Sequence, residues 1–199
     1  QGSANLSSRT VRAHVDLGVQ SIEAVLPVKG NRMKGSLAAS ADISGSIGRP
    51  RISAHVRGNN LKWQDYILGQ VEMEAGLDET GTLNIARLTV DNGEPVLTAQ
   101  GRVRLFKEGF SPDPLMPVLL DARLQSSDLK RLTARKEVEG SVAGNVHIEG
   151  NLLNPSGSIR FAGSGIGIGG VSLGDMRLEG GISNGVFEVA HAGLTNGSS

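Results

Sequence analysis

Apolar and polar residues alternate with a period of two along nearly the whole chain. Val11, Ala13, Val15, Leu17 and Val19 form the first such stretch, and most of their neighbours are polar. The same alternation returns at 37–43, 52–56, 71–77, 97–105, 118–124, 142–148, 159–161 and 176–182. Successive side chains of a strand point to opposite faces, so the pattern predicts strands with one apolar and one wet face.

Turn-forming residues separate these stretches. Residues 46–50 and 151–155 each end in proline, and 78–81 and 183–185 contain the Gly, Asn and Asp that suit hairpins. The proline-rich stretch 106–117 is expected to be a loop between two units. Helix signals are confined to about 21–26 and 127–133. Each of these segments begins with a polar N-cap residue and is long enough for one or two helical turns.

A shift of 105 residues superimposes one part of the chain on another. Gly35–Gly69 falls on Gly140–Gly174 without a gap, and ten of the 35 aligned positions are identical. Such repeats indicate an elongated, modular body. We expect residues 1–10 to be disordered or added to the natural sequence. We expect 11–113 to form a first β-repeat unit and 114–199 a second, truncated unit of one continuous sheet excised from a longer protein.

Too few helices are predicted to cover the apolar faces of these strands. The sheet could pack on itself as a sandwich, close into a barrel, or curl into a trough whose apolar inside holds something else. The inward positions are mostly small, and the chain has only six aromatic residues. A sandwich core about 10 Å thick normally uses bulkier side chains. Small inward residues favour an all-β, elongated, curled sheet: a trough with an apolar interior and one or two very short helices.

Composition narrows the classes of function. Glycine supplies 28 of 199 residues, which suits short strands joined by tight turns. Twenty basic and 20 acidic side chains balance, so nothing favours nucleic-acid binding. No cysteine is present, which excludes disulfides and thiolate metal sites. No apolar run is long enough to span a bilayer as a helix.

Residue patterns for catalysis or cofactor binding are absent from the sequence. The four histidines, His14, His55, His147 and His191, lack metal-ligand spacing and fall on or beside the wet faces of strands. The glycine-rich stretch 163–170 is followed by more strand pattern rather than by the helix that a dinucleotide site needs. No motif frames a nucleophilic serine. We expect no enzyme activity, no cofactor and no metal.

Trp63 and Tyr66 lie between two predicted strands of the first repeat, where the second repeat has Ile168 and Val171. Two interpretations fit them. They pack locally at a bend, or they form a lip of the trough that contacts lipid or a partner, since these side chains suit a half-wet surface.

The segment 35–52 reads Gly-Ser-Leu-Ala-Ala-Ser-Ala-Asp-Ile-Ser-Gly-Ser-Ile-Gly-Arg-Pro-Arg-Ile, and 140–159 is its second copy. This order of glycine, alternating strand, glycine, short turn, proline and strand resembles the recurring segment of the TamB family, in the AsmA-like superfamily. Residues 128–132 resemble the short helix that precedes each segment. The resemblance covers most of residues 11–197.

The resemblance implies a long curled sheet with an apolar interior, often called a β-taco. It implies a periplasmic location in a Gram-negative envelope, as part of an inner-membrane-anchored protein. Two roles in outer-membrane biogenesis follow from it. One is conduction of phospholipid between the inner and outer membranes. The alternative is a scaffold or chaperone for outer-membrane protein assembly and protein secretion, with an Omp85-type partner bound through other parts of the parent protein.

The residues themselves leave three functions open: a lipid conduit, a scaffold that offers strand edges to clients, and a purely structural β-rod. The conduit interpretation assigns phospholipid acyl chains to one set of apolar positions. The expected lining is Leu37, Ala39, Ala41, Ile43, Ile52, Ala54, Val56, Val71, Met73, Val142, Val146, Ile148, Ile159, Phe161, Met176 and Leu178.

Overall fold

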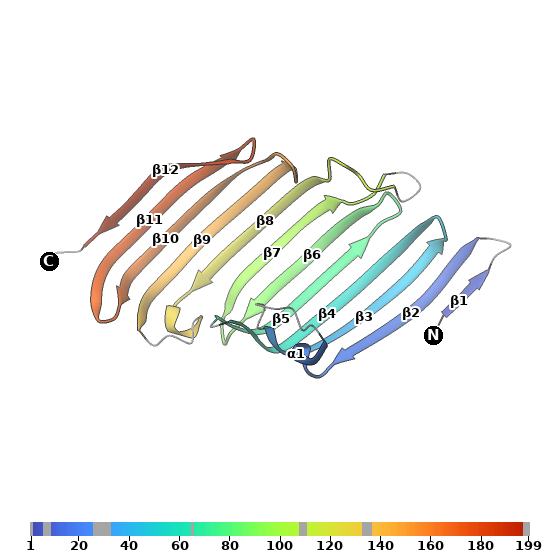
Figure 1. The fold of residues 1–199 in the computed structure, drawn as a ribbon, viewed down its shortest axis with the longest axis horizontal. Coiled ribbons are helices and arrows are strands. Elements are labelled where there is room, and N and C mark those ends of the chain that lie inside the picture. Colours follow the sequence, from blue (N-terminus) through green and yellow to red (C-terminus); the bar gives the residue numbers. More distant parts are fainter. Residues whose placement is uncertain are drawn as a thin grey trace.

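The computed structural model describes residues 2–5, 9–25, 33–64, 66–107, 111–132 and 137–196. These residues form one sheet of 12 strands whose spatial order is the order of the sequence (Figure 1). Every pair of neighbouring strands is antiparallel. The chain is therefore a continuous meander, and the expected all-β, elongated and curled sheet is confirmed.

The strands are β1 (Gly2–Asn5), β2 (Thr10–Val19), β3 (Met33–Ser46), β4 (Arg49–Trp63), β5 (Tyr66–Leu77), β6 (Thr82–Asp91), β7 (Pro95–Arg104), β8 (Pro117–Ser126), β9 (Val138–Asn151), β10 (Pro155–Ile168), β11 (Val171–Ser183) and β12 (Val186–Thr195). Two single helical turns, α1 (Ile22–Val25) and the 3-10 turn η2 (Leu129–Arg131), fall inside the two ranges where the sequence predicts helix. Within residues 1–10, Gly2–Asn5 pairs with β2 as β1.

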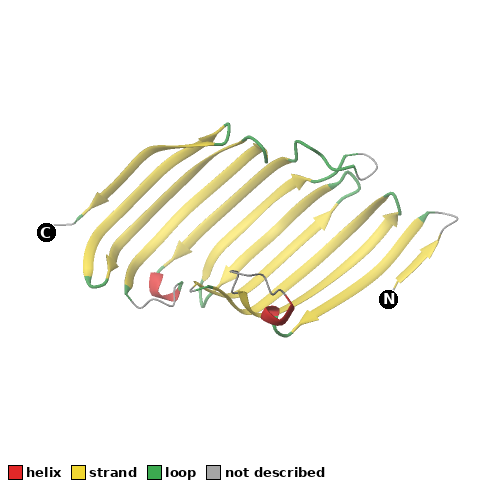
Figure 2. Ribbon diagram, in the orientation of Figure 1, coloured by secondary structure: helices red, strands yellow, loops and turns green. Residues whose placement is uncertain are grey.

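The sheet is a single layer. Figure 2 shows the two helical turns beside strand ends at one edge, and the described residues form no helical layer over either face. The accessible surface is 12963 Å², whereas a compact protein of this mass exposes about 8,900 Å². Among the described residues, the buried apolar side chains are Ile22, Leu61, Val90 and Val96. The fold therefore holds together through its strand ladders and half-buried side chains rather than through a closed core.

The 105-residue repeat is also a structural repeat. β3 and β4 correspond to β9 and β10, and β5 and β6 correspond to β11 and β12. The irregularities in the ladders repeat as well. The register shifts between Gly58 and Leu61 on β4 and again between Gly163 and Ile166 on β10. The sequence repeat therefore encodes the same bulges, and with them the same local bends of the sheet.

Paired glycines set the conformation at these irregular points. Gly69 and Gly174 have φ of 70° and 83°. A Cβ atom at Gly69 would lie 2.4 Å from the backbone oxygen of Asp91, and one at Gly174 would lie 2.2 Å from that of Thr195. Only glycine therefore combines this left-handed backbone with so close an approach of the next strand.

Candidate functional site

The strand registers place the apolar residues on one face of the sheet. Opposite residues of neighbouring strands share a face, so a row can be followed from strand to strand. One such row runs Leu17, Ala39, Val56, Met73, Leu88, Ala99, Ala122, Val146, Ile159, Gly180 and Val189. It crosses all strands from β2 to β12 without a polar side chain. We call the surface that contains this row the apolar face.

All 16 residues that the sequence assigns to the lining of a groove lie on the apolar face. On β3 and β4, for example, Ala39 lies opposite Val56 and Ile43 lies opposite Ile52. On β10 and β11, Phe161 lies opposite Leu178. Each of the 16 is half-buried. The structure thus brings the expected set together on one surface, while contact with lipid remains a proposal.

The apolar face is large and open. Strands lie about 4.8 Å apart and rise about 3.4 Å per residue, so eleven strands with several apolar positions each present on the order of 1,000 Å². Exposure is highest toward the ends of the sheet, where Leu17 is 54% and Val189 52% exposed. The described residues display an apolar face but no enclosed apolar interior.

Histidines and carboxylates form matched pairs on the opposite, polar face. His14 Nδ1 lies 2.8 Å from an oxygen of Asp42, across β2 and β3. His147 Nδ1 lies 2.7 Å from an oxygen of Asp121, across β9 and β8. The two pairs occupy equivalent places in the two repeats with the partners exchanged.

These carboxylates change the acidity of the histidines. The hydrogen bond with Asp42 raises the pKa of His14, and the charge of Asp16 adds to the effect. The hydrogen bond with Asp121 raises the pKa of His147, with a further contribution from Glu149. No group of three or more potential metal ligands occurs among the residues that the structure describes. The pairs therefore act as cross-strand contacts on a wet surface.

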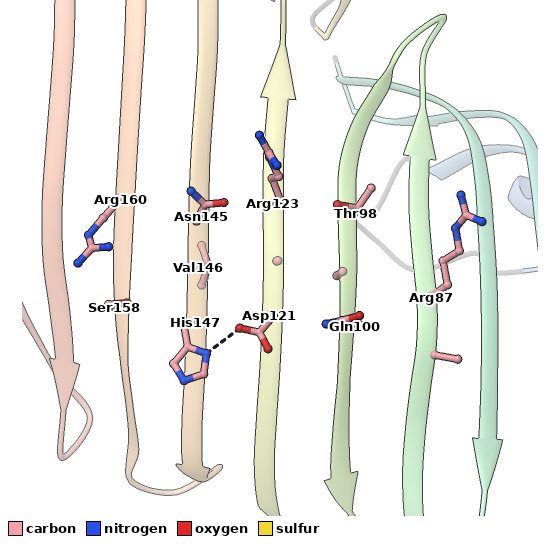
Figure 3. Close-up of a pocket in the computed structure, with 13 residues that line it drawn as sticks. Arg87, Thr98, Gln100, Asp121, Arg123, Asn145, Val146, His147, Ser158 and Arg160 are labelled. Carbon is pink, nitrogen blue, oxygen red and sulfur yellow. Dashed lines mark hydrogen bonds and ion pairs between the residues drawn. The ribbon is translucent and has the colours of Figure 1, made fainter.

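A shallow hollow of about 690 Å³ lies on the polar face over β6 to β10. Figure 3 shows its labelled side chains, which come from five neighbouring strands. Arg87, Arg123 and Arg160 are the cationic members, and Asn145 lies between the last two. The acidic member, Asp121, is already bonded to His147. The hollow therefore carries an excess of positive charge, although the whole chain has a net charge of zero.

Sequence reasoning did not find this hollow, because its residues are spread over 75 positions from Ala86 to Arg160. A signal was present in the repeat. The residues of the first copy that correspond to Arg123 and Arg160 are Asp16 and His55, as the strand registers show. The charge changes at these aligned positions, and this difference between the repeats was the sequence signal for the hollow.

Trp63 and Tyr66 stack at the turn between β4 and β5, with ring centroids 5.9 Å apart and an angle of 26° between the planes. They are 45% and 48% exposed. Their counterparts at the β10–β11 turn, Ile168 and Val171, are 52% and 62% exposed. The two turns thus carry apolar side chains at the same edge of the sheet, and a role for them as a lip remains a prediction.

Comparisons with known proteins leave the chain without an assigned relative. No family model, curated protein or solved structure matches it. Within the described part of the chain, no helix is long and apolar enough to cross a membrane.

Proposed function

We propose that this chain is a segment of a hydrophobic groove that conducts phospholipid between two membranes, with its apolar face in contact with acyl chains. The observation that carries the proposal is the unbroken apolar row from Leu17 to Val189. The resemblance of residues 35–52 and 140–159 to the TamB repeat supports the same function. We propose with it a periplasmic location, as part of an inner-membrane-anchored protein, which the same resemblance implies.

The open apolar face needs a partner. The largest apolar patch on an ordinary soluble monomer measures about 300–600 Å², and a sheet normally buries its apolar side under a second layer. Here the face is larger, and most of its side chains are half-buried or exposed, with Val90 a buried exception. An acyl chain is a suitable cover because it is apolar along its whole length and makes no demand for hydrogen bonds.

The energetics favour conduction over tight binding. Moving an acyl chain of roughly fifteen carbons into water costs on the order of 12 kcal/mol, at about 0.8 kcal/mol per CH₂. A continuous apolar surface removes most of that barrier. The row contains small residues, such as Ala39, Ala99 and Ala122, so an acyl chain that slides along it meets little steric obstruction. This role uses no catalytic residue.

Site-specific photo-crosslinking in the parent protein tests the proposal in cells. A crosslinking residue at Ile43, Val56, Val146, Ile148 or Phe161 is expected to capture phospholipid. The same residue at Asp42, His55 or His147, on the polar face of the same strands, is the matched control. Equal capture from both faces would overturn the conduit. Capture of outer-membrane protein precursors in place of lipid would favour a scaffold for outer-membrane protein assembly.

A further inference from the structure

We propose that the hollow on the polar face binds a phosphate group, held between Arg123 and Arg160 over Asn145. The site is independent of the conduit, because it lies on the face opposite the apolar row. It rests on strand register, on the charges that line the hollow, and on a comparison of the two repeats.

The register places the three side chains in one row. Arg123 on β8 lies opposite Asn145 on β9, and Asn145 lies opposite Arg160 on β10. Strands are spaced about 4.8 Å apart, so the Cα atoms of the two arginines lie roughly 10 Å apart. Two extended arginine side chains can therefore meet over Asn145, whose amide adds a hydrogen-bond donor. Guanidinium groups are well suited to phosphate oxygens because they donate two parallel hydrogen bonds.

Neither arginine is engaged by a carboxylate among the described residues. Elsewhere on the polar face such partners are found, as in Arg57, whose Nε donates to Glu72 over 3.0 Å. Asp121, two residues before Arg123, accepts from His147 instead. Glu179 lies opposite Arg160 in register but forms no ion pair with it. In Figure 3 the guanidinium of Arg160 extends away from Asn145 and that of Arg123 extends along its strand. Exposed side chains change rotamer in nanoseconds, so both are available to a ligand.

The first repeat offers the same backbone with a different charge. Its equivalent row is Asp16, Ser40 and His55 on β2, β3 and β4. The row of the second repeat is Arg123, Asn145 and Arg160. Both rows are exposed or half-buried, so either set of side chains would keep the polar face soluble. Solubility therefore does not explain the change from Asp16 and His55 to two arginines. Of the two equivalent rows, only that of the second repeat carries two guanidinium groups that can bind an anion.

Nuclear magnetic resonance titration of the protein with inorganic phosphate at low salt is the direct test. Saturable shifts are expected at the backbone amides and arginine side chains of Arg123, Asn145 and Arg160. The double variant Arg123→Asp with Arg160→His introduces the residues that the first repeat has at these two positions. Each charge-assisted contact accounts for about ten-fold in affinity, so this variant should bind roughly 100-fold more weakly. Glu179→Gln should bind more tightly, because it removes the carboxylate that lies opposite Arg160 in register.

A matched control separates a site from general attraction. Arg12→Asp with Arg177→His makes the same change of net charge on the polar face, outside the hollow, and should leave phosphate binding unchanged. If both double variants lose binding equally, or if the shifts are unsaturable and scattered, the proposal is overturned.

Vesicles identify the source of the phosphate. Phosphatidylcholine vesicles with and without phosphatidic acid are compared in a flotation assay. Binding of free phosphate that the vesicles do not compete with assigns a soluble ligand. Binding to phosphatidic acid that requires both arginines assigns a lipid headgroup. If neither probe depends on Arg123 and Arg160, no phosphate site exists.

Discussion

At the residue scale, the polar face contains groups whose behaviour depends on partners across the strands. His147 has Asp121 at 2.7 Å and Glu149 at 3.8 Å, and lies opposite Ser158 on the other side. The raised pKa of His147 means that the folded state binds a proton more tightly than the unfolded chain. Protonated His147 therefore stabilises the folded state. This contribution is complete below the unfolded pKa of about 6.5 and is lost as the pH rises through the raised folded pKa.

Titration of the imidazole signals by nuclear magnetic resonance is expected to place the pKa of His147 above about 6.5. Asp121→Asn should lower it. The difference in melting temperature between the wild type and His147→Gln should shrink as the pH rises from about 6 to about 9. A titration midpoint for His147 at or below that of an unstructured peptide would contradict the pairing.

The alternation of the sequence was enough to place single side chains on a face. All four histidines lie on the polar face, as expected, and one of them, His191, is on the edge strand β12. All 16 assigned apolar positions share the other face. Partners could not be predicted in the same way. The bond between His147 and Asp121 depends on the register of β8 and β9, and alternation alone does not fix how far one strand slides along another.

At the element scale, the bulge of β4 is a tightly packed point of an otherwise open sheet. Leu61 is 3% exposed. A Cβ atom at Gly58 would lie 2.4 Å from Leu61 Cδ1, and one at Gly35 would lie 2.8 Å from Leu61 Cδ2. The leucine therefore fills the space that the two glycines leave. Ile166 lies over Gly163 in the same way on β10.

Leu61→Ala is expected to lower the free energy of unfolding by about 2–4 kcal/mol, because it empties a tightly packed position. Ile166→Ala should cost less, since Ile166 is only half-buried. Chemical denaturation measures both. Leu153→Ala, at a position 65% exposed in a turn, is the control and should change stability by less than about 0.5 kcal/mol. Equal effects of Leu61→Ala and Leu153→Ala would show that the bulge is not a packing centre.

Strand existence was predictable at this scale, and strand length was not. The sequence pattern on β4 stops near Val56, whereas the strand continues to Trp63. The reason is the register shift between Gly58 and Leu61. An extra residue in a strand moves the following apolar side chains by one place, so a strict period of two no longer describes them.

At the scale of the whole molecule, the elongated curled sheet was predictable because the repeat and the shortage of helix leave few other arrangements. The position of the hollow could not be predicted from the sequence, because it depends on the summed twist of many strands. Register also rules out His147→Asp as the polar-face control for a variant at the neighbouring Ile148. His147→Asp would face Asp121 with a like charge, which is unfavourable between neighbouring strands.

Ile148→Asp in the parent protein is expected to abolish lipid transport while the purified chain still folds. Ile148 lies between Leu120 and Gly157 on the apolar face and is half-buried. A carboxylate there stays hydrated but interrupts the path of the acyl chains. Outer-membrane barrier integrity and thermal melting are the two measurements. Ala143→Asp, on the polar face of the same strand, should have little effect on either.

Two other results would change the interpretation. Unfolding of the Ile148→Asp chain would mean that the site belongs to a closed dry core, as in a structural rod. Normal melting with intact cells would mean that lipid does not pass this point.

The meander has one more consequence, which concerns distance. Each 105-residue unit adds six strands, from β3 to β9, in an order that never doubles back. At a spacing of about 4.8 Å per strand, one unit advances the sheet by roughly 29 Å. Deleting or duplicating a unit would therefore shorten or lengthen the protein by that step and leave its cross-section unchanged. If the proposed conduit is right, the number of such units would act as a molecular ruler that sets how wide a gap the protein can bridge.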